Sequence, residues 1–239
     1  MKKYIVYIKG VLFIGVFLFL FGFAAHRNKE KEIDNIDLKF TNGDNLFIDY
    51  KTVNKLLIQN YGELKSQRKE NIILRKLEHT LRSNEMIEDA DVYLTIDGTI
   101  GATIKQRTPI ARINDEGVAY YIDRKGDKMP LSSNYSARVP LLSGSTSKNT
   151  KEVYKMALLI FNDSFLQKQI IGIQINKKDE FSLSTRVGNQ KIEFGRFDNI
   201  DSKFKKLKAF YQKALNDKTL DKYQTINLIF NKQVVCTKK

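Results

Sequence analysis

The chain has few of the residues from which enzymes and metalloproteins build their sites. Its 239 residues include one cysteine, two histidines and no tryptophan. The single cysteine, Cys236, excludes an intramolecular disulfide, and its position far from the N-terminus excludes a lipoprotein anchor there. Two histidines and one cysteine do not supply the four ligands of an ordinary zinc site. The fold is therefore expected to depend on packing alone, with no metal and no cofactor.

Recognisable catalytic motifs are also missing. The sequence contains no Gly-x-Ser-x-Gly, no His-Glu-x-x-His and no phosphate-binding glycine-rich loop. His79 is alone in a predicted helix, where it is interpreted as a structural or solvated side chain. Scattered Asp and Glu residues leave acid catalysis open without favouring it. We predict no catalytic residues and a protein that is not an enzyme; a secreted enzyme is the least favoured alternative.

The charge is strongly positive, with 41 basic and 27 acidic residues and a formal net charge of +14. Such a balance can indicate a nucleic-acid partner. Here the lysines are spread over the whole chain, with no arginine-rich block and no aromatic RNA-binding signature. We therefore predict no nucleic-acid binding. The charge is interpreted as a solvated lysine-rich surface with some attraction to anionic lipid nearby.

One long apolar run, residues 4–25, lies at the N-terminus. Its last sixteen residues, 10–25, carry no charge and include five phenylalanines. At about 1.5 Å per residue this part spans roughly 24 Å, short of the roughly 30 Å hydrocarbon core. Extension to Tyr4 gives sufficient length, provided that the flexible Lys9 side chain reaches the headgroups. We predict a transmembrane helix over 4–25, after a short cytoplasmic N-terminus, residues 1–3.

Two alternatives compete with an uncleaved anchor. A buried core helix is disfavoured because no face of the segment is polar. A cleaved signal peptide fits the basic start at Lys2 and Lys3 and the small residues Gly22 and Ala24, but the run is long for a signal core. Lysines lie on both sides of the run, so the positive-inside rule barely discriminates. The short N-terminal end favours an N-terminus inside and the following domains outside.

After a charged stalk, residues 26–35, the pattern predicts a compact α+β domain over 36–107. Asp97 and Gly98 form a hairpin turn pair between two segments of alternating apolar and polar residues. Two stripes of apolar residues at helical spacing precede this hairpin. Two helices are therefore expected to cover one face of a three-stranded sheet, in the order β-α-α-β-β. The predicted strands are 36–40, 91–96 and 99–106, and the predicted helices lie around 53–60 and 69–83.

Pro109 marks a boundary, because proline restricts the preceding residue to extended geometry. Beyond it, residues 108–235 predict a mostly antiparallel β domain with two helices, followed by a tail, 236–239. Asn149 is a candidate cap for the first of these helices, and the second begins at Asp201 or Ser202. The predicted strands are 110–113, 118–122, 129–131, 139–142, 170–175, 181–187, 191–194 and one long final strand, 224–235.

The final strand is a candidate interaction site. A strand next to a chain terminus is a natural sheet edge, and an edge offers unpaired N–H and C=O groups to a partner strand. Lysines commonly block such edges, and Lys232, Lys238 and Lys239 are available to do so. The edge is therefore either protected by these lysines or left open as a docking site.

The order of these features resembles the bacterial division family FtsQ, called DivIB in Gram-positive bacteria. The first domain resembles the POTRA domain of that family. Residues 120–131, with Gly126 and Met129-Pro130-Leu131, resemble the form found in the Bacteroidetes branch. Residues 84–92 resemble the family segment that ends in the motif V-x-x-A-x-V, and residues 105–112 resemble its junction E/Q-R-x-P-x-A. Glu193-Phe194-Gly195 together with Lys206-Leu207 resemble the family pair L-G and K/R-L. Residues 226–230 resemble the closing strand V-D-L-R-Y.

The resemblance implies a non-enzymatic scaffold of the division machinery, anchored in the inner membrane with its domains in the periplasm at the septum. Such proteins bind the bitopic proteins FtsB and FtsL, and FtsB adds to the last strand of the β domain. The POTRA-like domain would bind an upstream division protein through residues that the sequence does not identify. Another POTRA-bearing envelope assembly or secretion component is the alternative.

Transferred to this sequence, the family's docking aromatic corresponds to Phe230. A basic position that helps bind an acidic group on FtsB corresponds to Lys177 or Lys178. This chain departs from the family pattern, because Ile229 replaces a frequent arginine and Phe230 lacks a tyrosine hydroxyl. The residues expected to bind the partner are Leu228, Phe230, Lys232, Val234, Val235, Lys177 and Lys178.

Overall fold

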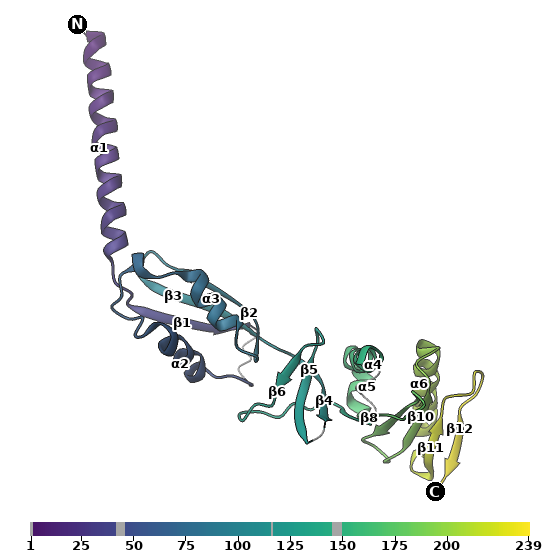
Figure 1. The fold of residues 1–239 in the computed structure, drawn as a ribbon. Helices are drawn as coiled ribbons and strands as arrows, with labels where there is room; N and C mark the ends of the chain where they lie inside the picture. The colour runs from purple at the N-terminus through teal and green to yellow at the C-terminus, as the bar shows by residue number, and fades with distance from the viewer. Residues whose placement is uncertain (1, 42–45, 116, 145–149) are drawn as a thin grey trace. The chain divides into compact units, whose positions relative to one another are not determined.

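The computed structural model describes residues 2–41, 46–115, 117–144 and 150–239 (Figure 1). The chain divides into two compact units, Met1–Gln106 and Arg107–Lys239. The candidate helix cap Asn149 lies outside the described residues. Each unit has a hydrophobic core of its own, so the two are described separately.

The first unit begins with the long helix α1 (Lys2–Glu30). Its part from Tyr7 to Glu30 is long enough to cross a membrane and contains an 18-residue stretch with a mean hydropathy of 2.3; it is the one such helix among the described residues. The predicted stalk, 26–35, is not a separate segment. Because no glycine or proline interrupts the charged residues after the apolar run, α1 continues through them. Ile33 then enters the core of the first unit, where it is 2% exposed.

The remainder of the first unit confirms the predicted β-α-α-β-β order. The three strands form a sheet in the order β1-β3-β2, in which β1 is parallel and β2 antiparallel to β3. The helix predicted over 69–83 is shorter, because the first residues form the 3-10 turn η2 (Lys69–Asn71). The elements are β1 (Asn35–Phe40), α2 (Tyr50–Tyr61), α3 (Leu74–Arg82), β2 (Ile87–Leu94) and β3 (Thr99–Gln106).

Packing between helices and sheet follows the apolar stripes of the sequence. Val53 and Leu57 of α2 and Leu77 and Leu81 of α3 are at most 1% exposed. They share one cluster with alternate residues of the sheet, Ile100, Ala102 and Ile104 among them. Asp49 caps α2, since its Oδ1 accepts a hydrogen bond from Thr52 N at 2.8 Å.

The second unit is built on one sheet of nine described strands, in the order β12-β11-β10-β9-β8-β7-β4-β5-β6. Most neighbouring strands are antiparallel, but β4–β7, β7–β8 and β10–β11 are parallel pairs. The strands are β4 (Pro109–Asp115), β5 (Val118–Asp123), β6 (Lys128–Pro130), β7 (Leu141–Gly144), β8 (Ile170–Ile175), β9 (Phe181–Thr185), β10 (Lys191–Gly195), β11 (Tyr223–Asn227) and β12 (Val235–Lys238). The mixed α+β class predicted for the whole chain is confirmed.

Three described helices, α4 (Thr150–Asn162), α5 (Ser164–Gln169) and α6 (Ile200–Asn216), accompany this sheet, together with the 3-10 turn η3 (Leu220–Lys222). Residues of α4 and α6 share a core with the inward side chains of β8, β9 and β10, such as Ile173, Leu183 and Ile192. The short helix α5 was not predicted. Asp163 begins it by accepting hydrogen bonds from Phe165 N and Leu166 N.

Asp163 also connects α5 to α6 through an ion pair with Lys208. Burial alone would raise the pKa of Asp163, but hydrogen bonds from the Lys208 ammonium and from Leu166 N lower that pKa overall. The carboxylate therefore stays ionised, both as a helix cap and as a tertiary contact.

The final strand predicted over 224–235 is wrong, because the chain reverses within it. β11 ends at Asn227 and β12 begins at Val235, antiparallel to β11. Two contacts mark the end of β11: Leu228 N donates to Glu193 O at 2.9 Å, and Ile229 N donates to the Asn227 side chain at 2.9 Å. The predicted tail, 236–239, therefore lies largely in the edge strand β12, and Cys236 is a residue of this terminal strand, as its small, partly apolar side chain indicates.

Candidate functional site

The two outermost strands of the large sheet differ in what they offer to a partner. β6 is three residues long and ends in Pro130, which lacks an N–H group. β12 pairs only with β11 among the described strands and contains no proline (Figure 1). Alternate N–H and C=O groups of such an edge strand point away from its neighbour. β12 is therefore the better edge for the addition of a strand.

The segment between β11 and β12, residues 228–234, is called the β11–β12 loop below. Its side chains have very different environments: Leu228 is fully buried, whereas Ile229 and Phe230 are 49% and 48% exposed. Leu228 belongs to the core beneath the sheet, so its side chain is not available to a partner, contrary to the expectation from the sequence. Val234 packs partly against the same core.

Two of the expected residues remain accessible beyond Phe230. Lys232 is exposed in the β11–β12 loop, and Val235, at the start of β12, is 40% exposed. Ile229, Phe230 and Val235 thus present apolar surface next to the open edge. Exposed apolar groups beside unpaired backbone groups suit an extended segment that adds to the sheet.

Lys206 of α6 holds the β11–β12 loop in place. Its ammonium donates to the Phe230 carbonyl at 2.6 Å and to the Leu228 carbonyl at 3.3 Å. Beneath the loop, Gly195 has φ +75°, and a Cβ there would lie 2.9 Å from Ile229 Cγ1. Both residues belong to the segments that carry the family resemblance, although the sequence pattern of this helix predicts mainly a solvated face for its lysines. Only the fold reveals the role of Lys206, because it lies more than twenty residues from the loop.

Replacing Lys206 by methionine is expected to loosen the β11–β12 loop locally, because the carbonyls lose a charged donor worth about 1.5–3 kcal/mol. Hydrogen exchange of the amides in residues 228–234 should accelerate, while the rest of the sheet keeps its protection. Lys205→Met on the same helix is the matched control, since Lys205 is exposed. Equal exchange in both variants would contradict the role of Lys206.

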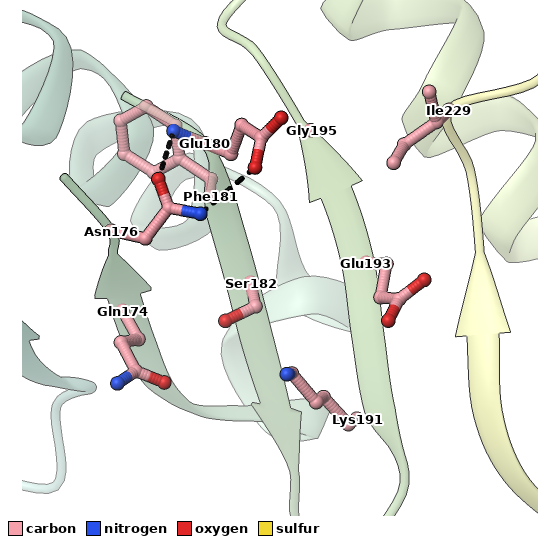
Figure 2. Close-up of a pocket in the computed structure, with 9 residues that line it drawn as sticks. All are labelled: Gln174, Asn176, Glu180, Phe181, Ser182, Lys191, Glu193, Gly195 and Ile229. Atoms are coloured by element: carbon pink, nitrogen blue, oxygen red, sulfur yellow. Dashed lines mark hydrogen bonds between the residues drawn. The ribbon is translucent and has the colours of Figure 1, made fainter. Parts of the chain in front are cut away.

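A hollow of about 350 Å³ lies beside the β11–β12 loop, on the sheet face formed by β8, β9 and β10 (Figure 2). Figure 2 shows Ile229 approaching it from the chain that follows β11, while the strands contribute mostly polar side chains. The lining residues are Gln174, Asn176, Glu180, Phe181, Ser182, Lys191, Glu193, Gly195 and Ile229.

The turn that carries Lys177 and Lys178 borders the same hollow. Asn176 orders this turn, since its Oδ1 accepts from Lys178 N at 2.8 Å and its Nδ2 donates to Glu180 Oε2 at 2.8 Å. Because Asn176 and Glu180 line the hollow together with Ile229, the hollow lies between the turn of Lys177 and Lys178 and the beginning of the β11–β12 loop. Both lysines are exposed there.

The chemistry of this surface is suited to recognition. Glu193 accepts a hydrogen bond from Asn227 Nδ2 at 2.6 Å, so its carboxylate is oriented by the end of β11. Burial raises the pKa of the Cys236 thiol, which keeps this residue protonated and weakly nucleophilic. The described residues contain no cluster of three or more His, Cys, Asp or Glu side chains suited to a metal ion. The surface offers a partner an unpaired backbone edge, apolar side chains and charged groups.

Comparison with known proteins agrees with this architecture. Residues 34–105 match the model of the POTRA-like domain, and residues 108–237, more than half of the chain, match the model described as FtsQ/DivIB, C-terminal related. The chain is 25% identical over 155 residues to the cell division protein FtsQ of Salinibacter ruber. The matched region covers 59% of this chain and 60% of that protein. The chain therefore belongs to the FtsQ/DivIB, C-terminal related family.

Proposed function

We propose that this protein is a membrane-anchored, non-enzymatic scaffold of the bacterial division machinery. It binds FtsB- and FtsL-like bitopic proteins outside the inner membrane and helps recruit and regulate septal peptidoglycan synthesis. α1 is the single anchor, with the N-terminus in the cytoplasm and both folded units in the periplasm at the septum. Family membership supports the role in division, and the apolar helix supports the anchor.

The open edge of β12 is the observation that carries the partner interaction. A partner strand pairs with β12 through its backbone, while Phe230 and Val235 supply apolar contact beside it. Lys177 and Lys178, across the neighbouring hollow, bind an acidic group of the partner. Lys232 contributes to the rim, where a charge influences the association rate more than the affinity.

The POTRA-like unit has a separate task in this proposal, the binding of an upstream division protein. Its sheet has two outer strands, β1 and β2, so it has edges of its own. Two partner-binding units on one anchor bring proteins together within the plane of the membrane. Shared attachment to the membrane raises the effective concentration of bitopic partners.

Depletion of the protein in cells tests the function directly. Filamentous cells with unconstricted septa are expected, because septal synthesis would no longer be recruited. Restoration of division by the unchanged gene is the control. Normal division combined with defective outer-membrane assembly would contradict the proposal and favour the POTRA-bearing assembly alternative.

A further inference from the structure

Ile96, at the tip of the β2–β3 hairpin, is an unusual turn residue. It is 85% exposed, more than any other large apolar side chain described, those of α1 included. Turns normally carry polar residues, Gly or Pro. A single exposed apolar side chain is ordinary on a protein surface. The position of this one beside the end of α1 is what distinguishes it.

A buried lysine joins the hairpin tip to α1. The Lys69 side chain, in a residue only 8% exposed, donates to Ile96 O at 2.6 Å and to Asn28 Oδ1 at 2.9 Å. Those two oxygens bind one nitrogen, so they lie close together. Asn28 follows the end of the apolar run, Ala25, by three residues, or about 4.5 Å along a helix. The hairpin tip therefore lies within roughly 10 Å of the apolar part of α1.

Backbone contacts fix the same arrangement independently of the Lys69 side chain. Lys69 N donates to Lys31 O at 3.0 Å, and Asp34 N donates to Gly98 O at 3.0 Å. The backbone of Gly98 lies so close to the backbone of Glu32 that a Cβ at position 98 would be 2.7 Å from Glu32 O. The segment after α1 is thus held between η2 and the hairpin turn. A rotation of the first unit about α1 would have to break these bonds.

We infer that the hairpin tip of the first unit is a membrane-contact site, in which Ile96 enters the interface of the bilayer that α1 spans. The partner is the lipid surface itself. The gain from burying one apolar side chain is small. It suffices here because α1 already holds the tip beside the membrane, so no translational entropy remains to be lost.

Charges around the tip are nearly balanced. Arg68 lies near Glu30 and Glu70, at 4.0 and 3.7 Å, and the exposed Lys31 has Asp97 as an opposite charge on the hairpin. A balanced surface gains little from anionic headgroups. The contact is therefore expected to depend on apolar insertion and to form on neutral lipid as well.

The chain contains no tryptophan, so single-tryptophan variants report local environment directly. We suggest reconstituting full-length Ile96→Trp in phosphatidylcholine vesicles with lipids brominated near the headgroup. The tryptophan at position 96 should lose most of its fluorescence emission. Adding phosphatidylglycerol to the vesicles should change this quenching little. Tyr50→Trp is the matched control: its ring is 4.9 Å from Phe40, at the far end of β1, about 17 Å from the tip.

This inference rests on the anchor of the proposed function, so a third variant separates the two. Phe17→Trp, within α1, should be quenched by lipids brominated near the bilayer centre. If Phe17→Trp is quenched and Ile96→Trp is not, the contact is refuted and the anchor stands. If neither is quenched, the anchor is refuted as well. Quenching of Ile96→Trp only in anionic vesicles would overturn apolar insertion, and equal quenching of Tyr50→Trp would overturn a contact specific to the tip.

Discussion

Replacing Phe230 by glutamate is expected to lower the affinity for an FtsB-like partner by about 30-fold or more, the loss of about 2 kcal/mol typical of an interface hot spot. Phe230 is half exposed in the β11–β12 loop, so its side chain has apolar surface left for a partner to cover. A carboxylate there would have to be desolvated beside a docked strand. Co-purification with the co-expressed partner, followed by titration, measures the effect.

The fold should survive this change, because the Phe230 backbone, and not its ring, receives the Lys206 hydrogen bond. Val187→Glu is the matched control, since Val187 is 44% exposed in the same unit and lies in the turn between β9 and β10. It should bind the partner normally. Undiminished binding by Phe230→Glu would refute the β11–β12 loop as part of the docking site.

Replacing Arg107 by methionine is expected to lower the free energy of unfolding of the second unit by about 3–5 kcal/mol, the cost of breaking a buried ion pair. Arg107 Nη1 donates to Asp123 Oδ2 at 2.7 Å and to Asp127 Oδ2 at 2.9 Å. Asp123 is 1% exposed, so the methionine variant leaves a buried carboxylate without its cation. Urea unfolding of the full-length protein in detergent, followed by circular dichroism, provides the measurement.

Two further variants make the origin of this loss specific. Arg138→Met removes an exposed arginine from the same unit and should change stability by about 0.5 kcal/mol or less. Adding Asp123→Asn to Arg107→Met should recover part of the loss, because the amide oxygen still accepts from Lys125 N and Asp127 N without a charge. An equal loss in the Arg107 and Arg138 variants would contradict the buried-pair explanation.

The first unit could be predicted closely from local signals. Asp97-Gly98 sets the hairpin, and the apolar stripes on α2 and α3 define the buried faces. The stalk predicted over 26–35 was wrong, because the sequence shows where apolar character ends but not where helix α1 ends. The burial of Ile33 depends on a partner segment, residues 66–69, that is distant in sequence.

The end of the second unit could be predicted only in part. Ile226 and Leu228 are both fully buried, so the alternation typical of a strand continues past the point where β11 stops. No glycine or proline marks the reversal within 228–234. After Leu228 the chain leaves β10: the Asn227 side chain accepts from Ile229 N, and Lys206, far away in sequence, binds the Phe230 carbonyl. Tertiary hydrogen bonds of this kind leave no periodic trace in a sequence.

The parallel pairing of β10 with β11 makes α6 the connection that crosses from one strand to the next. The same helix packs against the sheet through Phe204 and Leu207 and holds the β11–β12 loop through Lys206. The core and the proposed docking edge are therefore thermodynamically linked. A partner that binds only the ordered loop stabilises α6 by mass action. A core substitution that shifts α6 lowers the affinity for the partner, although the substituted residue does not contact the partner.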